Sequence, residues 1–233
     1  MTLKMQNKQM IPASAGWRRF LSVKALLALA LMSVLMLSCK EDDGVVNEFD
    51  NWQEVNDQYI SRLQATVDQK IAAGDKTWKK IPNWSFETGV AKTASQFIYV
   101  HVLTEGTGSG SPLYTDSVKV NYRGRLIPSA SHPTGMMFDQ SYTGTLDDTA
   151  LPFKMAVNGV VDGFSTALQH MHIGDVWEIH IPYQLGYGSS AQGSVPAYST
   201  LVFNLNLKAY YRKGQVVPTR GSEAAVTGRW IEK

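Results

Sequence analysis

The chain of 233 residues is long enough for one domain with a well-filled core and additional segments. Its 22 basic and 20 acidic residues give a formal net charge of +2, and the sequence has no basic stripe with interleaved aromatic residues that would indicate a nucleic-acid-binding protein. A single cysteine excludes a disulfide within the chain.

The first 38 residues have the features of a secretion signal. Five basic residues and no acidic residue stand in this leader, which includes an almost wholly apolar run, Ala25 to Leu37. The run is shorter than the ~20 residues that a membrane-spanning helix needs, so we expect residues 1–38 to be a cleaved signal peptide. Without the five basic residues of the leader, 17 basic residues remain against 20 acidic ones, a net charge of −3.

Cys39 comes directly after this leader. The sequence Met36-Leu37-Ser38-Cys39 resembles the lipobox of bacterial lipoproteins, which implies that Cys39 is lipidated and anchors the chain to a membrane. The alternative is a buried thiol near a cleavage site. The charged residues Lys40 to Asp43 resemble a tag for the outer membrane, or else form a solvated linker. We expect a lipid-anchored protein of the cell envelope, of the outer membrane and either periplasmic or surface-exposed, with residues 39–47 as a tether.

Residues 48–95 are expected to form an amphipathic helix and a connector. The helix is predicted from Glu48 to Ala73, where apolar residues recur every three or four positions before Gly74. The stripe is too short and irregular for a coiled coil, so we expect packing within the chain and slightly favour a monomer over a dimer. Turn residues and isolated aromatic residues indicate an irregular connector from Asp75 to Ser95. The apolar stripe consists of Trp52, Val55, Tyr59, Leu63, Val67 and Ile71.

Strand patterns dominate the region that follows. Alternation of apolar and polar residues predicts strands, each with one buried face. Between them, Phe164 to Met171 has the spacing of a short helix that ends before Gly174. We expect an α+β domain over residues 96–212, a curved antiparallel sheet wrapped around this short helix, and a tail at 213–233. The predicted strands are 97–103, 118–126, 152–157, 176–181 and 201–209.

Eight blocks of this region resemble, in their order and spacing, the FKBP-type peptidyl-prolyl cis-trans isomerases. The resemblance covers residues 96–210, about half of the chain. It implies an FKBP-like fold and an enzyme that acts on proline-containing polypeptides without a cofactor or a metal. The blocks are VLTEGTG (102–108), SVKVNYRGRL (117–126), MFDQSY (137–142), PFKM (152–155), VVDGF (160–164), ALQHMHIGD (167–175), IPYQLGYG (181–188) and VPAYSTLVFNLNL (195–207).

The implied reaction explains the residue types in these blocks. Rotation about an X-Pro bond faces a barrier of about 18–20 kcal/mol because the amide is stabilised by resonance. The reaction needs no nucleophile or general base. It needs an environment that holds the amide twisted and keeps water from its carbonyl oxygen. An apolar slot with aromatic walls and few polar groups provides this environment.

The resemblance also implies roles for individual residues of this sequence. The hydroxyl of Tyr187 and the backbone N–H of Val161 would hold substrate carbonyl groups, and Asp139 would order the site by a hydrogen bond to Tyr122. Phe164 would form the floor of the proline pocket, where the family more often has tryptophan. Without the resemblance, the phenylalanines would be read as core residues and Asp139 as a turn cap. The remaining implied substrate-binding residues are Phe138, Phe153, Val160, Val195 and Phe203.

Two departures from the family pattern affect the expected slot. Ser194 stands where an apolar rim residue is common, and the loop from Pro128 to Thr134 is longer than in compact members. Because this loop precedes Phe138, we expect it to overhang the slot. His170 and His172 are interpreted as a helix-end pair, since no third metal ligand stands nearby.

Two other functions are alternatives to the isomerase. The same fold could serve as a binding module or chaperone for an envelope partner, with little turnover, and the long loop motivates this alternative. A chaperone that dimerises through residues 48–73 is the other. The sequence contains no Ser-His-Asp spacing, phosphate-binding loop or dinucleotide fingerprint. We therefore expect an isomerase that assists the folding of exported proteins.

Overall fold

The computed structural model describes residues 47–86, 89–90, 93–145, 150–212 and 229–232. The chain divides into two units, residues 1–45 and residues 46–233, and the expected signal peptide and Cys39 lie outside the described residues. The helices of the described part are α2 (Trp52–Ala72) and α3 (Asp162–His170), with short 3-10 turns η1 (Ala94–Gln96), η2 (Val157–Gly159) and η3 (Tyr183–Leu185). Its strands are β1 (Trp78–Pro82), β2 (Phe97–Thr104), β3 (Ser117–Leu126), β4 (Met137–Gln140), β5 (Phe153–Ala156), β6 (Val176–Ile181), β7 (Leu201–Arg212) and β8 (Arg229–Glu232).

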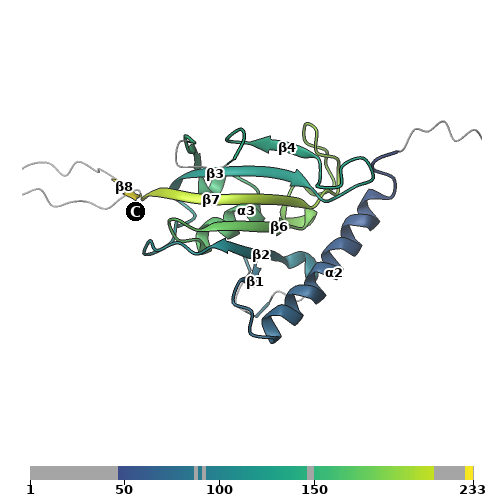
Figure 1. Cartoon of the computed structure of the whole chain (residues 1–233), viewed down its shortest axis with the longest axis horizontal. Coiled ribbons are helices and arrows are strands. Elements are labelled where there is room, and N and C mark those ends of the chain that lie inside the picture. Colours follow the sequence, from purple (N-terminus) through teal and green to yellow (C-terminus); the bar gives the residue numbers. More distant parts are fainter. Residues whose placement is uncertain (1–46, 87–88, 91–92, 146–149, 213–228, 233) are drawn as a thin grey trace, which may run out of the picture. The chain divides into compact units, whose positions relative to one another are not determined.

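These strands form one antiparallel sheet in the order β1-β2-β6-β7-β3-β4, with β5 paired to β3 and β8 paired to β7. The longest strands, β3 and β7, lie side by side at its centre (Figure 1). Their alternating residues point to opposite faces of the sheet, so each long strand contributes to two different surfaces.

The short helix α3 packs against one face of the sheet, as Figure 1 shows. Ala167 and Leu168 are fully buried against residues of the sheet such as Ile179 and Leu205. The helix approaches β6 very closely at Gly163, where any added Cβ would overlap with Cγ2 of Ile181. The expected α+β architecture, a curved antiparallel sheet wrapped around a short helix, is confirmed.

Helix α2 packs on the opposite face and runs obliquely to the strands (Figure 1). Ile60 and Val67 pack against Tyr99, which lies on β2 between two core-facing residues. The expected packing within the chain is therefore observed. The predicted apolar stripe is wrong at two positions, because Val55 and Ile71 are exposed. Ile60 and the polar Asn56 are buried instead, which rotates the contact face of the helix.

Two segments outside the predicted domain add strands to the sheet. The connector from Asp75 to Ser95 is not irregular throughout, because Trp78–Pro82 pairs with β2 as strand β1. Trp78 stacks on His101 of β2 with a ring-centroid distance of 4.4 Å. In the expected tail, Arg229–Glu232 pairs with β7 as β8. Within the part of the chain that the structure describes, no helix has the length and apolar character to cross a membrane.

Candidate functional site

A cavity of about 350 Å³ opens between the first turn of α3 and the sheet. It is shaped by the helix, by the segment that leads into it and by inward-facing residues of β3 and β7. Its walls are largely apolar and aromatic, which is the character expected of a slot for a proline ring. The lining residues are Tyr122, Asp139, Met155, Gly159, Val160, Val161, Phe164, Tyr187 and Phe203.

Aromatic rings form the base of this cavity. Phe164 is buried, and its ring meets the ring of Phe203 edge to face at a centroid distance of 5.0 Å. Tyr122 packs edge to face against both rings, at 6.1 Å from Phe164 and 6.2 Å from Phe203. Edge-to-face packing of this kind fixes each ring by its neighbours. The cavity therefore has a preformed aromatic floor, with Phe164 on α3 at its centre.

Few polar groups face the cavity. The hydroxyl of Tyr122 donates a hydrogen bond of 2.9 Å to Oδ2 of Asp139. Asp139 is exposed, and its other carboxylate oxygen, Oδ1, accepts the backbone N–H of Gln140 at 2.8 Å. Burial, followed by the hydrogen bond and charge of Asp139, raises the pKa of Tyr122. Burial and the same carboxylate raise the pKa of Tyr187. Both hydroxyls therefore remain protonated hydrogen-bond donors around neutral pH.

The structure brings seven of the ten predicted site residues to the cavity, and the other three do not line it. Phe138 packs behind the floor, with its ring 5.4 Å from that of Phe203. Phe153 stands against Tyr122 at 6.2 Å and is 52% exposed, so it lies at the rim of the aromatic cluster. Val195 is buried in the core.

Met155 and Gly159 line the cavity although sequence reasoning did not select them. Met155 stands within the PFKM block, two residues from Phe153 and therefore on the same face of β5. That alternation is the signal that could have identified it. For Gly159, which lies in the 3-10 turn η2, the sequence contains no comparable signal.

The loop from Pro128 to Thr134 does not overhang the cavity, so this expectation was wrong. Pro128 and Thr134 line a groove of about 660 Å³ on the other face of the sheet, where Arg123 and Arg125 alternate with the slot-facing residues of β3. The loop is held there by Glu48, whose carboxylate accepts hydrogen bonds from Ser129 and from the backbone N–H of Ser131. Glu48, four residues before α2, thus fixes the loop on the face of the sheet opposite the slot.

Five charged or polar side chains of this outer groove are joined by contacts with one another. Arg125 donates from Nη2 to Glu178 at 2.7 Å and from Nη1 to Asn204 at 2.7 Å. His180 lies with Nε2 3.3 Å from Glu178 and with Nδ1 3.0 Å from the hydroxyl of Tyr59 on α2. This chain of contacts links the sheet to α2, and it gives the groove a structural role.

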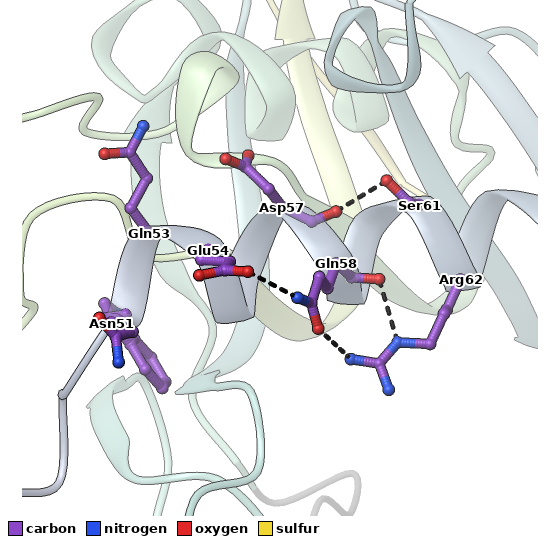
Figure 2. A pocket seen from close by; sticks show the side chains of 8 residues that line it. Asn51, Gln53, Glu54, Asp57, Gln58, Ser61 and Arg62 are labelled. Atoms are coloured by element: carbon purple, nitrogen blue, oxygen red, sulfur yellow. Dashed lines mark hydrogen bonds between the residues drawn. The ribbon is translucent and has the colours of Figure 1, made fainter.

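A larger hollow, of about 730 Å³, lies along the first turns of α2 (Figure 2). Most of its side-chain hydrogen bonds stay within the helix: Gln58 donates to Glu54 at 3.1 Å, and Arg62 and Ser61 donate to carbonyl groups one turn earlier. Gln53 donates to the hydroxyl of Tyr183 at 3.3 Å. Apart from Asn51, all of its lining residues come from this single helix, and apart from Trp52 all are polar. The hollow is therefore a solvated helix surface, and the smaller aromatic cavity is the candidate site.

Within the described ranges no group of three or more His, Cys, Asp or Glu side chains is placed to hold a metal ion. His170 donates from Nδ1 to the carbonyl oxygen of Thr166 at 2.8 Å, one turn earlier in α3. Nor does the slot contain a nucleophile paired with a base. Its groups can enclose an apolar ring, exclude water and donate hydrogen bonds, which is chemistry that acts on conformation.

The chain matches known isomerases in sequence. Residues 108–208 match the family model described as FKBP-type peptidyl-prolyl cis-trans isomerase. The FKBP-type 22 kDa peptidyl-prolyl cis-trans isomerase of Escherichia coli K12 is 38% identical over 147 residues, which are 63% of this chain and 62% of that protein. The chain thus spans about three fifths of that relative's length, and what the whole relative does is a hypothesis for this chain.

Two further proteins extend the comparison. A crystal structure of the peptidyl-prolyl cis-trans isomerase of Pseudomonas syringae pv. tomato is 27% identical, with a TM-score of 0.47, over 67% of this chain and 94% of that one. The macrophage infectivity potentiator of Trypanosoma cruzi is 30% identical over 184 residues, 78% of this chain and 81% of that protein. Together with these sequence relatives, the family model, which matches the region that carries the aromatic cavity, shows that the chain belongs to the FKBP-type peptidyl-prolyl cis-trans isomerase family.

Proposed function

We propose that this chain catalyses cis-trans isomerisation of X-Pro bonds in polypeptides. The observation that carries the proposal is the cavity of about 350 Å³ with an aromatic floor and the Tyr122–Asp139 hydrogen bond at its side. A proline ring is apolar and compact, so it would sit on Phe164 while the adjoining amide lies among the few polar groups.

Catalysis in this slot would proceed without covalent chemistry. The planar amide loses its resonance as it twists, and its nitrogen becomes more basic while its carbonyl carbon loses double-bond character to nitrogen. A slot that excludes water from the carbonyl favours the twisted amide relative to the planar one. The Tyr187 hydroxyl and the Val161 N–H would hold the neighbouring carbonyl groups of the substrate and so keep the chain in the twisted geometry.

The proposal is tested by protease-coupled isomerisation of a short X-Pro peptide with residues 40–233. We expect the wild-type chain to accelerate exchange. Asp139→Leu and Tyr187→Phe should each reduce kcat/KM by about tenfold, the effect of about 1.4 kcal/mol in transition-state binding. Tyr183→Phe is the control, because Tyr183 is also a partly exposed tyrosine, but its hydroxyl bonds to Gln53 of α2 and it does not line the cavity.

A folded wild-type chain without catalysis would refute the isomerase proposal and favour the binding module. The long loop, which motivated the binding module, lines the other face of the sheet. A chaperone dimer through residues 48–73 stays a hypothesis, although α2 already buries Ile60 and Val67 against its own sheet. The monomer, slightly favoured, is tested by sizing the chain with and without this helix.

We further propose that the protein acts in the cell envelope, held by a lipid on Cys39, and that its substrates are exported polypeptides. The leader of 38 residues and the lipobox-like Met36 to Cys39 support this. Mass spectrometry of the mature protein from membranes should find acyl chains on an N-terminal Cys39. A Cys39→Ala chain should lose the acyl chains and the membrane association. Recovery of an unacylated, uncleaved chain would contradict the proposed location.

A further inference from the structure

The segment Asn83 to Phe86, here called the strap, joins strand β1 to the residues that lead into η1. It lies before residues 108–208, the part of the chain that matches the family model. The strap nevertheless reaches α3, the helix that carries the floor of the slot. Its contact residues, Asn83 and Thr166, are both almost completely buried although they are 83 positions apart in the sequence.

The contact is centred on the hydroxyl of Thr166. This hydroxyl lies 2.8 Å from Oδ1 of Asn83 and 2.8 Å from the carbonyl oxygen of Asp162, and it accepts the backbone N–H of Trp84 at 3.1 Å. One side-chain oxygen therefore links two consecutive residues of the strap to the first turn of α3. Because the group is buried, water cannot replace these hydrogen bonds if they are lost.

The strap is itself held in place by further contacts. The backbone N–H of Asn83 donates to the carbonyl oxygen of Gln96 at 2.9 Å, and its side-chain amide donates to Ser85 at 2.9 Å. The ring of Trp84 stacks on that of Tyr114 at a centroid distance of 4.2 Å. The strap is thus held in place independently of α3, so its contact with Thr166 can fix the position of this helix.

The position of α3 determines the geometry of the slot. The helix has nine residues and begins directly after Val161, and Phe164 stands in its first turn. A helix this short is marginal by itself, so contacts with its surroundings determine where it lies. Gly163 fixes its distance from β6, and the strap holds it through Thr166.

We propose that Asn83 and Thr166 are positioning residues for the isomerase, and that the strap sets the slot through α3. The inference rests on the proposed function. In the transition state the amide must meet a floor and an N–H donor at fixed positions, whereas the planar substrate can bind to a slightly displaced floor. Loss of the strap contact should therefore lower kcat more than it raises KM.

The test compares Thr166→Val, which removes the hydroxyl at nearly constant shape, with Thr166→Ser, which keeps it. We expect Thr166→Val to lower kcat about five- to tenfold with KM changed less than about twofold, and Thr166→Ser to retain most of kcat. Thr66→Val is the matched control, because the Thr66 hydroxyl makes a similar bond of 3.0 Å to the carbonyl oxygen of Arg62 on α2, away from the slot.

A second readout is independent of turnover. In NMR spectra, Thr166→Val should shift the amide resonance of Val161 and the ring resonances of Phe164, and Thr66→Val should leave them in place. Unchanged resonances together with unchanged kcat would overturn the inference, as would equal losses in Thr166→Val and Thr166→Ser. If wild type shows no turnover, the proposed function fails, and the NMR comparison still decides the role of the strap. If Thr166→Val does not fold, Asn83→Ala is measured in the same way.

Discussion

Replacement of Gly124 by alanine tests the packing beneath the slot. Gly124 lies on β3 opposite Phe203 of β7, and a Cβ at this position would lie 2.5 Å from Cε1 of Phe203 and 2.7 Å from Cζ of Phe138. Neither ring can move freely, because Phe203 is held edge to face by Phe164 and Phe138. The added methyl group must therefore displace a ring toward the cavity.

The expected loss of stability follows from two opposing effects. Overpacking of a filled core destabilises by about 1–3 kcal/mol. Alanine loses less backbone freedom than glycine in a strand, which returns about 0.5–1 kcal/mol. The free energy of unfolding should therefore fall by up to about 2.5 kcal/mol, and a domain of this size loses roughly 2–4 °C in Tm for each kcal/mol.

Urea unfolding and the isomerisation assay together measure this effect. We expect a lower unfolding midpoint with an unchanged m-value, and a lower kcat/KM because the floor is displaced. Gly159→Ala is the control for stability, since a Cβ there would meet its nearest neighbour, Cβ of Ala156, at an ordinary 3.6 Å. Full stability and full activity of Gly124→Ala would refute the reasoning that these rings are tightly fixed against β3.

Two further predictions concern the contacts of α2 and the outer groove. The hydrogen bond of Glu178 with His180, then that with Arg125, lowers the pKa of Glu178 from 4.5 to about 2, so its contribution to stability is present above about pH 4.5 and is lost as the pH falls toward 2. Glu178→Gln should flatten the measured dependence of stability on pH in this range, and an unchanged curve would contradict the pairing. Asn56→Leu should destabilise the chain by about 1–3 kcal/mol, because the buried N–H of Thr200 loses its acceptor, and a neutral effect in urea unfolding would show that water replaces the bond.

Much of the sheet and the slot could be predicted from sequence because the relevant signals are local. Alternation with period two identified the buried faces of β3, β6 and β7, and helical spacing identified α3. The strand alternation also determines that Tyr122 faces the slot, and that Gly124 lies on the same side of β3 against Phe203, while Arg123 and Arg125 face the outer groove. The family resemblance indicated which of the inward-facing residues line the slot. No local pattern could do so, because the spacing of a slot residue is the same as that of a core residue.

The added strands and the loop could not be predicted by the same means. Strand β1 has five residues, including two adjacent lysines and a proline, and becomes a strand because the edge of β2 offers hydrogen bonds to it. The position of the loop from Pro128 to Thr134 depends on Glu48, which lies far earlier in the chain and binds Ser129 and Ser131. Each placement is determined by a partner that is distant in the sequence.

The face of α2 shows why polar residues are the hardest to place. An apolar stripe is visible in the sequence, but Asn56 is polar and periodicity assigns it to solvent. In the structure its side-chain oxygen accepts the N–H of Thr200 at 2.7 Å, and its amide donates to the carbonyl oxygen of Trp52 at 2.7 Å. The indole N–H of Trp52 in turn donates to the hydroxyl of Ser199 at 2.8 Å.

These bonds determine the rotation of α2, because apolar contacts alone tolerate small rotations while a buried hydrogen bond requires its partner at a fixed direction and distance. The same argument applies to Asn83 and Thr166 at the strap. In both places a segment outside the family-matched region is joined to the domain by buried polar groups. Such pairs have no signature in a single sequence, since each member alone looks like an ordinary surface residue. The segments that precede a catalytic domain can therefore shape its site through contacts that only the structure reveals.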